Sequence, residues 1–149
     1  MAIVEELSGQ LLALASPTEI RRAATCTRPA CRTGATPCSH PSTGSGLGPP
    51  PPAGGYRPTD AQQRFLRARD RRCRQPGCRM PVPRAGELDH NRPYPDGPTS
   101  AGNLTGFCTG HHRGKHQAPG WAYDLDPATG ELTVTTPSGL VATTEPPPF

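Results

Sequence analysis

The sequence predicts a small α+β domain with long loops, preceded by a short and partly flexible N-terminal segment. Hydrophobic residues make up only 32% of the 149 residues and aromatic residues 5%, well below the share that usually builds a globular core. Glycine and proline supply 17 and 21 residues, which shortens regular elements and lengthens loops. Six cysteines offer the cross-links that such a small core needs.

Residues 1–41 form the N-terminal segment, for which the sequence predicts two short elements. In AIVEELSGQLLAL, apolar runs on both sides of Ser8-Gly9 favour a β-hairpin over the alternative of a helix. Residues 18–25 predict a short helix. The following STGSGLGPPPPAGG, residues 42–55, combines a Gly/Ser-rich stretch with polyproline and is typical of a linker. We therefore expect the second domain to span residues 56–149.

The second domain is predicted to begin with a helix. TDAQ is a capping box, in which Thr59 is the N-cap and Gln62 the third helical residue. The helix should run to about Asp70 and place Ala61 and Phe65 on one face. Its arginines should lie largely outside: Arg64, Arg67, Arg69 and Arg71.

Short strands and long loops should make up the rest of this domain. Six prolines between residues 76 and 98 forbid any long regular element there, although Glu87–Leu88 is strand-like. WAYDLDPATGELTVTT and SGLVATT then predict short strands joined by glycine-containing turns, and hence a C-terminal β-hairpin. Loops of this length need additional stabilising contacts to hold a defined conformation.

The positive charge of the chain is unevenly distributed. The net charge is +4 and the pI about 8.9, with 15 arginines and one lysine among the 16 basic residues. Eight arginines fall between Arg64 and Arg84, while the last 30 residues contain none. This pattern favours a phosphate-binding surface over the alternative of a solvated helix face. The candidate DNA contacts are Arg64, Arg67, Arg69, Arg71, Arg72, Arg113 and Lys115.

The N-terminus and the apolar runs bear on where the protein works. MAIVEELSGQLLALAS lacks the basic region that begins a signal peptide. No stretch approaches the roughly 18 apolar residues of a membrane span. We therefore expect a cytoplasmic protein without a membrane partner, in which cysteine clusters hold metal more often than they form disulfides.

Two cysteine motifs share one pattern that suits zinc. CTRPACR and CRQPGCR both read Cys-x-x-Pro-small-Cys-Arg, which brings two thiols together around a tight proline turn. Cys73 and Cys78 form one ligand pair, and Cys108 with His111, spaced C-x2-H, forms a second. A structural zinc takes four such ligands as two close pairs. His112 is the alternative to His111 as the fourth ligand.

The first motif predicts a second zinc site with weaker support. Its ligands would be Cys26, Cys31, Cys38 and His40, although Cys38-x-His40 is an unusually tight pair. An unliganded tail before the linker is the alternative.

Five further polar residues suit the hydrolysis of a phosphodiester. Asp89 offers the hard oxygen that Mg²⁺ or Mn²⁺ prefers, and His90 has a side chain that titrates near neutral pH and suits a general base. Neighbours on a strand point to opposite faces, so both would address one phosphate only if the strand bulged locally. His116 lies four residues after His112, on the same helix face, and is a second candidate ligand. Asn103 completes the set.

Together, LDHNRPYPDG, GNL and HHRGKH resemble the motif of the HNH endonucleases, which have the ββα-metal fold. More specifically, residues 56 to about 145 resemble the zinc-containing HNH module that ends longer proteins. The resemblance implies that His90 is the general base and Asp89 a metal ligand. It also implies that Asn103 braces the loop between two strands and that His112 binds the divalent ion.

The resemblance leads to the hypothesis of a metal-dependent DNA endonuclease that contains structural Zn²⁺ and uses Mg²⁺ or Mn²⁺. One alternative is a zinc-stabilised nucleic-acid-binding module whose nuclease activity has lapsed, and another is a zinc-dependent protein-interaction module.

Overall fold

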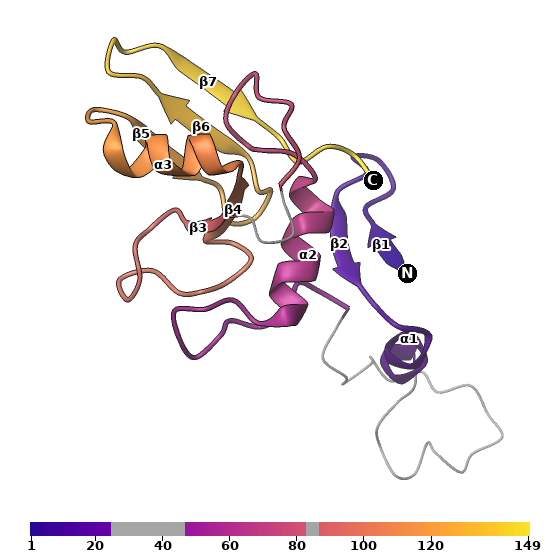
Figure 1. Cartoon of the computed structure of the whole chain (residues 1–149). Coiled ribbons are helices and arrows are strands. Elements are labelled where there is room, and N and C mark those ends of the chain that lie inside the picture. Colours follow the sequence, from indigo (N-terminus) through magenta and orange to yellow (C-terminus); the bar gives the residue numbers. More distant parts are fainter. Residues whose placement is uncertain (25–46, 83–86) are drawn as a thin grey trace, which may run out of the picture.

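The computed structural model describes residues 1–24, 47–82 and 87–149 (Figure 1). These residues form a small α+β protein with short helices and three small antiparallel sheets. The predicted α+β class is therefore confirmed. The elements are β1 (Ala2–Val4), β2 (Leu11–Leu14), α1 (Pro17–Ala24), α2 (Asp60–Asp70), β3 (Glu87–His90), β4 (Leu104–Phe107), α3 (Thr109–Gln117), β5 (Ala122–Leu125), β6 (Leu132–Thr135) and β7 (Val141–Thr144).

The N-terminal segment forms the expected β-hairpin, and not the alternative helix. β1 and β2 pair antiparallel, with an irregular register between Ile3 and Val4. Gly9 in the connecting turn has φ +69°, a conformation that glycine adopts without a steric penalty. The short helix predicted for residues 18–25 is α1, which begins at Pro17.

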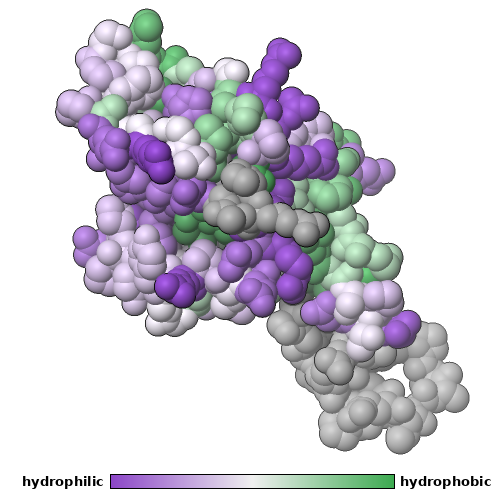
Figure 2. Space-filling view, viewed as in Figure 1, coloured by the Kyte–Doolittle hydropathy of each residue, from purple (hydrophilic) through white to green (hydrophobic). Residues whose placement is uncertain are grey.

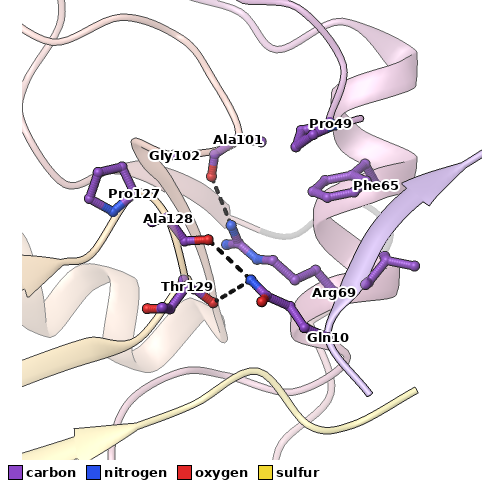
Figure 3. A pocket seen from close by; sticks show the side chains of 11 residues that line it. Gln10, Pro49, Phe65, Arg69, Ala101, Gly102, Pro127, Ala128 and Thr129 are labelled. Carbon is purple, nitrogen blue, oxygen red and sulfur yellow. Dashed lines mark hydrogen bonds between the residues drawn. The ribbon is translucent and has the colours of Figure 1, made fainter. Parts of the chain in front are cut away.

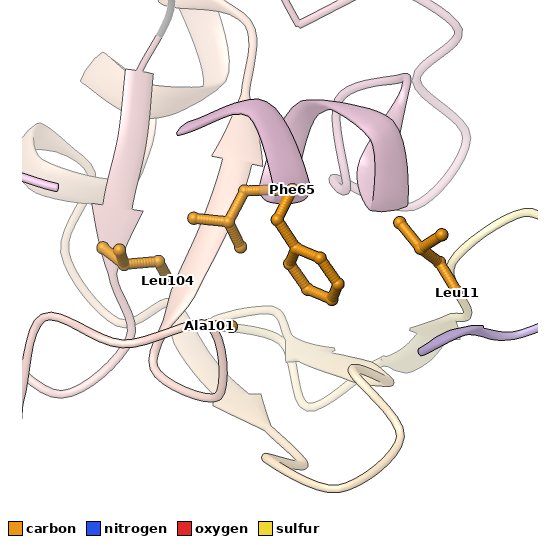
Figure 4. Packing of buried hydrophobic residues seen from close by; sticks show 5 residues of the cluster. Leu11, Phe65, Ala101 and Leu104 are labelled. Atoms are coloured by element: carbon orange, nitrogen blue, oxygen red, sulfur yellow. The ribbon is translucent and has the colours of Figure 1, made fainter. Parts of the chain in front are cut away.

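The hairpin packs against α2. The side chain of Leu11 is buried in one hydrophobic cluster with Phe65 and Leu104 (Figure 4). The side-chain amide of Gln10 donates to the carbonyl oxygens of Ala128 and Thr129, at 3.1 and 3.3 Å (Figure 3). These contacts border a small pocket, which none of the predicted metal ligands lines. The described start of the N-terminal segment thus lies directly on the second domain.

The predicted capping box begins α2. The Thr59 hydroxyl accepts from the backbone N–H of Gln62 at 3.2 Å, and the Gln62 side chain accepts from the backbone N–H of Thr59 at 2.9 Å. The amide of Gln62 also donates to the carbonyl oxygens of Pro51 and Thr99. Gln62 is therefore buried, whereas Ala61, which we expected on the buried face with Phe65, is exposed.

Arg69 lies inside the protein, so the expectation that it faces solvent is wrong. Its guanidinium donates to the Asp70 carboxylate at 2.7 Å and to the carbonyl oxygens of Ala101 and Leu104 at 2.7 and 2.8 Å. Arg74 also contacts Asp70, which is completely buried. A buried carboxylate requires such cationic partners. Arg69 is therefore part of the protein interior, with only 6% of the residue exposed.

A β-hairpin followed by a helix forms the centre of the second domain. β3 and β4 pair antiparallel in a regular register from Glu87↔Phe107 to His90↔Leu104, without the bulge considered for this strand. α3 follows β4 almost at once and contacts both strands. Figure 1 shows α3 beside these strands, and Asp89 of β3 contacts His112, Lys115 and His116 in the middle and last turn of α3.

The C-terminal strands form a three-stranded sheet in the order β5-β6-β7, which enlarges the predicted hairpin by one strand. Leu125, Leu132 and Val134 from this sheet are buried with Phe107 of β4 and with Cys73. Figure 2 shows a largely hydrophilic surface over α3 and hydrophobic residues along the β1–β2 hairpin. Within the described part of the chain, every helix is too short or too polar to cross a membrane.

Candidate functional site

Four predicted zinc ligands converge where α2 ends and α3 begins. Cys73 and Cys78 follow α2, Cys108 is the N-cap residue of α3, and His111 lies in its first turn. The four ligand atoms all lie within 4.8 Å of one another. The structure therefore forms a Cys3His cluster that could bind a metal ion.

The spacing of these atoms fits tetrahedral zinc. Nδ1 of His111 lies 3.5 Å from Sγ of Cys73 and 3.2 Å from Sγ of Cys108. In a tetrahedral site, Zn–S and Zn–N bonds of ordinary length place sulfur and nitrogen about 3.5 Å apart. Burial, with the nearby Cys108, raises the pKa of the Cys73 thiol to about 12. A cation bound by this thiolate would offset that effect.

The second candidate cluster contains Asp89, His112 and His116. Oδ1 of Asp89 lies 3.7 Å from Nε2 of His112 and 3.1 Å from Nε2 of His116. Neighbouring ligands in an octahedral Mg²⁺ site are about 3 Å apart, so this donor set suits a divalent ion. The side chain of Asp89 is 7% exposed and that of His116 is 55% exposed. The cluster is therefore open to solvent on the helix side.

Consecutive histidines serve different clusters. His111 contacts the cysteines, whereas His112 faces Asp89. Residues one position apart on a helix point about 100° apart, so one turn of α3 presents a ligand to each cluster. This geometry decides between His111 and His112 as the fourth member of the cysteine cluster.

His90 lies outside both clusters, at the end of β3. Its Nε2 is 2.8 Å from the hydroxyl of Thr99, and the ring of Tyr56 stacks on its imidazole at 5.1 Å and 27°. Burial lowers the pKa of His90, the Asp89 carboxylate acts to raise it, and the Lys115 cation lowers it further. The neutral imidazole is therefore favoured at neutral pH.

Asn103 braces the loop between β3 and β4. Its side-chain oxygen accepts from the backbone N–H of Arg92, and its amide donates to the carbonyl oxygens of Arg92 and Pro98, each at 2.9 Å. A Cβ at Gly97 would collide with the Arg92 carbonyl and the Asn103 amide. Glycine at this position therefore leaves room for the brace.

Lys115 was predicted to contact DNA, but its side chain turns inward. The ammonium group lies 2.6 Å from Oδ2 of Asp89 and 2.7 Å from the carbonyl oxygen of His90. Its side chain is only 10% exposed. Lys115 therefore occupies one carboxylate oxygen of Asp89 and leaves the other to His112 and His116. The expectation of an exposed cation is therefore corrected, because the ammonium group of Lys115 contacts Asp89 and His90 within the protein.

Glu87 and Thr99 are two site residues that sequence reasoning missed. Oε2 of Glu87 lies 3.5 Å from Nδ1 of His112. Because side chains two apart on a strand share a face, the position of Glu87 relative to Asp89 was a usable signal. Thr99 offered no comparable signal, since its contact with His90 depends on the path of the loop.

The remaining predicted residues divide into exposed ones and ones outside the described residues. Arg67 is partly buried, and burial lowers its pKa. Of the arginines predicted to contact DNA, those exposed are Arg64, Arg71, Arg72 and Arg113. The predicted second zinc ligands Cys26, Cys31, Cys38 and His40 lie outside the described residues, as does Arg84.

Comparison with known proteins finds relatives that are similar to this chain over 91 residues. The chain is 41% identical over 91 residues to the uncharacterized protein Rv3776 of Mycobacterium tuberculosis (strain ATCC 25618 / H37Rv). It is 40% identical over 91 residues to the uncharacterized protein Rv2100 of that strain and to MT2160 of strain CDC 1551 / Oshkosh. These matches cover 61% of this chain but only 16–17% of the relatives' lengths, so the chain spans about a sixth of each. No family model matches the chain, and no solved structure matches it significantly.

Proposed function

We propose that this protein is a metal-dependent DNA endonuclease of the HNH type. The observation that carries the proposal is the arrangement around α3, in which the Asp89 cluster and the Cys3His cluster lie on neighbouring sides of one helix. The β3–β4 hairpin against this helix also carries His90 and the Asn103 brace. A structural role alone would not require a second, open cluster of one carboxylate and two imidazoles beside a buried histidine.

The two clusters have different tasks in this proposal. Cys73, Cys78, Cys108 and His111 hold Zn²⁺, which ties the end of α2 to the start of α3. Asp89, His112 and His116 hold Mg²⁺ or Mn²⁺, which as a Lewis acid stabilises the charge that develops on a phosphodiester during hydrolysis. Because β3 is regular, the side chains of Asp89 and His90 leave it on opposite faces. His90 is the last residue of this strand, so in this proposal the phosphodiester passes around the end of β3, where His90 supplies the proton acceptor for the attacking water.

Hydrogen bonding identifies the atom of His90 that suits this task. The Thr99 hydroxyl donates to the carbonyl oxygen of Tyr56 at 3.3 Å, and a carbonyl oxygen can only accept. With its one hydrogen directed to that carbonyl oxygen, the hydroxyl accepts from Nε2 of His90, and in this proposal the neutral ring carries its hydrogen on Nε2. Nδ1 keeps its lone pair and is the atom that would receive a proton from water.

DNA would be attracted by the exposed arginines at the end of α2 and on α3. Arg71 and Arg72 follow α2, and Arg113 projects from α3. Their guanidinium groups can neutralise phosphates and release counterions, so binding should weaken as salt rises. Arg69 takes no part in this surface because it bonds Asp70 inside the protein.

One observation favours the second candidate, a zinc-stabilised nucleic-acid-binding module without activity. The ammonium group of Lys115 lies against Asp89 and occupies the carboxylate that the reaction would use. If this ion pair replaces a divalent ion, the protein would bind DNA and not cut it.

Incubation of the purified protein with plasmid, with and without Mg²⁺ or Mn²⁺, separates the two candidates. We expect metal-dependent nicking or cleavage that leaves 3′-hydroxyl and 5′-phosphate ends. His90→Ala should lower the rate about 100-fold or more, since it removes the base, while DNA binding persists. Gln117→Ala is the matched control, because it removes an exposed polar side chain of α3 outside both clusters and outside the arginine surface.

Two outcomes would contradict the nuclease proposal. If His90→Ala cuts as fast as the parent, His90 is not the base. If the parent protein binds DNA with a clear salt dependence but cuts no substrate with either metal, the inactive binding module is the better description.

A further inference from the structure

Two exposed aromatic rings flank His90. Tyr56 is 63% exposed and Tyr94 is 41% exposed. Their ring centroids lie 5.1 and 6.2 Å from the His90 ring and 5.9 Å from each other, with the two tyrosines nearly perpendicular. His90 itself is only 7% exposed. The surface beside the proposed base is therefore largely aromatic.

Both tyrosines are held by braced backbone. The carbonyl oxygen of Tyr56 accepts from the Thr99 hydroxyl, and the backbone N–H of nearby Ala53 donates to the Thr99 carbonyl oxygen at 2.8 Å. Tyr94 lies in the loop that Asn103 bonds on both sides. The two rings are thus presented from fixed positions and need little ordering when a ligand binds, which favours affinity.

Exposed cations lie beside these rings in the chain. Arg57 follows Tyr56 directly, Arg92 precedes Tyr94 by two residues, and both arginines are exposed. Aromatic faces combined with neighbouring cations are typical of surfaces that bind single-stranded nucleic acid, where bases stack and phosphates pair with the cations.

We propose that Tyr56 and Tyr94 form a stacking site for an unpaired nucleobase next to the phosphate on which His90 acts. This inference rests on the proposed nuclease function and adds a substrate class to it. A base within a duplex has both faces covered by its neighbours, so it offers no face to these rings without being unstacked. The protein should therefore prefer single-stranded or mismatched DNA to fully paired DNA.

Binding can be measured apart from cleavage. A single-stranded oligonucleotide containing 2-aminopurine, whose fluorescence falls on stacking, is titrated with zinc-containing protein without added Mg²⁺ or Mn²⁺. The same sequence as a duplex, and as a duplex with the 2-aminopurine mismatched, provides the comparison. We expect quenching with the single strand and with the mismatch, and affinity about tenfold or more above that for the paired duplex.

Substitutions then identify the rings that bind. Tyr94→Leu and Tyr56→Leu should each weaken single-strand binding roughly 5- to 150-fold, the range that base–aromatic stacking supports. Tyr94→Phe keeps the ring and should bind like the parent. Trp121→Leu removes an exposed aromatic residue next to β5 and should leave binding unchanged. Because Tyr56 stacks directly on His90 at 5.1 Å whereas Tyr94 lies farther away at 6.2 Å, Tyr94→Leu is the decisive variant.

The two proposals fail in different ways. Equal affinity for single strand and duplex, or parental binding by Tyr94→Leu, would overturn the stacking site even if plasmid is cut. Tyrosine-dependent binding of the single strand without any metal-dependent cleavage would support the stacking site and reject the nuclease.

Discussion

The Cys3His cluster and the Asp-His-His cluster differ in ligand chemistry and in access to solvent. The first has three soft sulfur donors and a histidine, which suit a closed tetrahedral zinc site. The second has one hard carboxylate and two imidazoles, too few to complete the coordination of Mg²⁺ or Mn²⁺. Each cluster has one buried ligand, Cys73 or Asp89, but the other ligands of the first are all partly buried, whereas the side chain of His116 in the second is 55% exposed. A metal ion with four protein ligands suits a structural role, whereas a metal ion with free coordination positions can bind water or substrate.

The two clusters are also held in place by different forces. Cys73 packs with Phe107 and Leu125 in a hydrophobic cluster, so the first site is part of the core. Asp89 and His112 are oriented instead by polar contacts with Lys115 and Glu87. α3 carries ligands of both clusters. The Cys3His cluster fixes the position of the helix, and the polar contacts orient the side chains of Asp89 and His112. Substitutions in the Cys3His cluster should therefore lower the stability of the fold, whereas substitutions around Asp89 should mainly change binding of the divalent ion.

The largest effect should come from removing a ligand of the buried cluster. Cys73→Ser should cost the protein its zinc and much of its folded state, because structural zinc contributes on the order of 10 kcal/mol in small domains. Zinc content by mass spectrometry and thermal unfolding measure this. His112→Ala is the matched control, since it should keep zinc and fold but lose Mn²⁺ binding. If Cys73→Ser and His112→Ala both lose zinc, or if neither does, the two clusters do not have the separate roles proposed for them.

A smaller effect is expected when the polar support of the open cluster is removed. Lys115→Met should weaken Mn²⁺ binding about tenfold, because changes to residues that orient metal ligands typically cost 10- to 100-fold in affinity. Electron paramagnetic resonance of free Mn²⁺ measures the affinity, and zinc content should stay constant. Arg113→Met, on the exposed side of α3, is the control. Unchanged or tighter Mn²⁺ binding would mean that Lys115 only repels the ion and does not position Asp89.

The smallest effect should follow from stiffening α3. A Cβ at Gly114 would meet no atom within 4 Å, and alanine is favoured over glycine in a helix interior by about 1 kcal/mol. Gly114→Ala should raise the free energy of unfolding by roughly 0.5–1 kcal/mol, as measured by denaturant titration. Gly110→Ala, near the start of the helix, should stabilise less. A destabilised Gly114→Ala would show that this turn must remain flexible between His112 and His116.

The local sequence determined the helix cap, the N-terminal hairpin and the ligand pairs of this protein. The capping box of Thr59 and Gln62, the hairpin around Gly9 and the C-x4-C and C-x2-H ligand pairs are interactions within a few residues, so spacing alone identifies them. The α+β class followed from the same local patterns.

Tertiary structure alone decided which long charged side chains face solvent and which turn inward. The Lys115 ammonium contacts Asp89, 26 residues earlier, and Arg69 contacts Leu104, 35 residues later. A flexible charged side chain can reach water or a buried partner from the same backbone position. Whether the charged group reaches water or a buried partner depends on segments that are distant in the sequence. The spacing of neighbouring residues therefore does not predict these contacts.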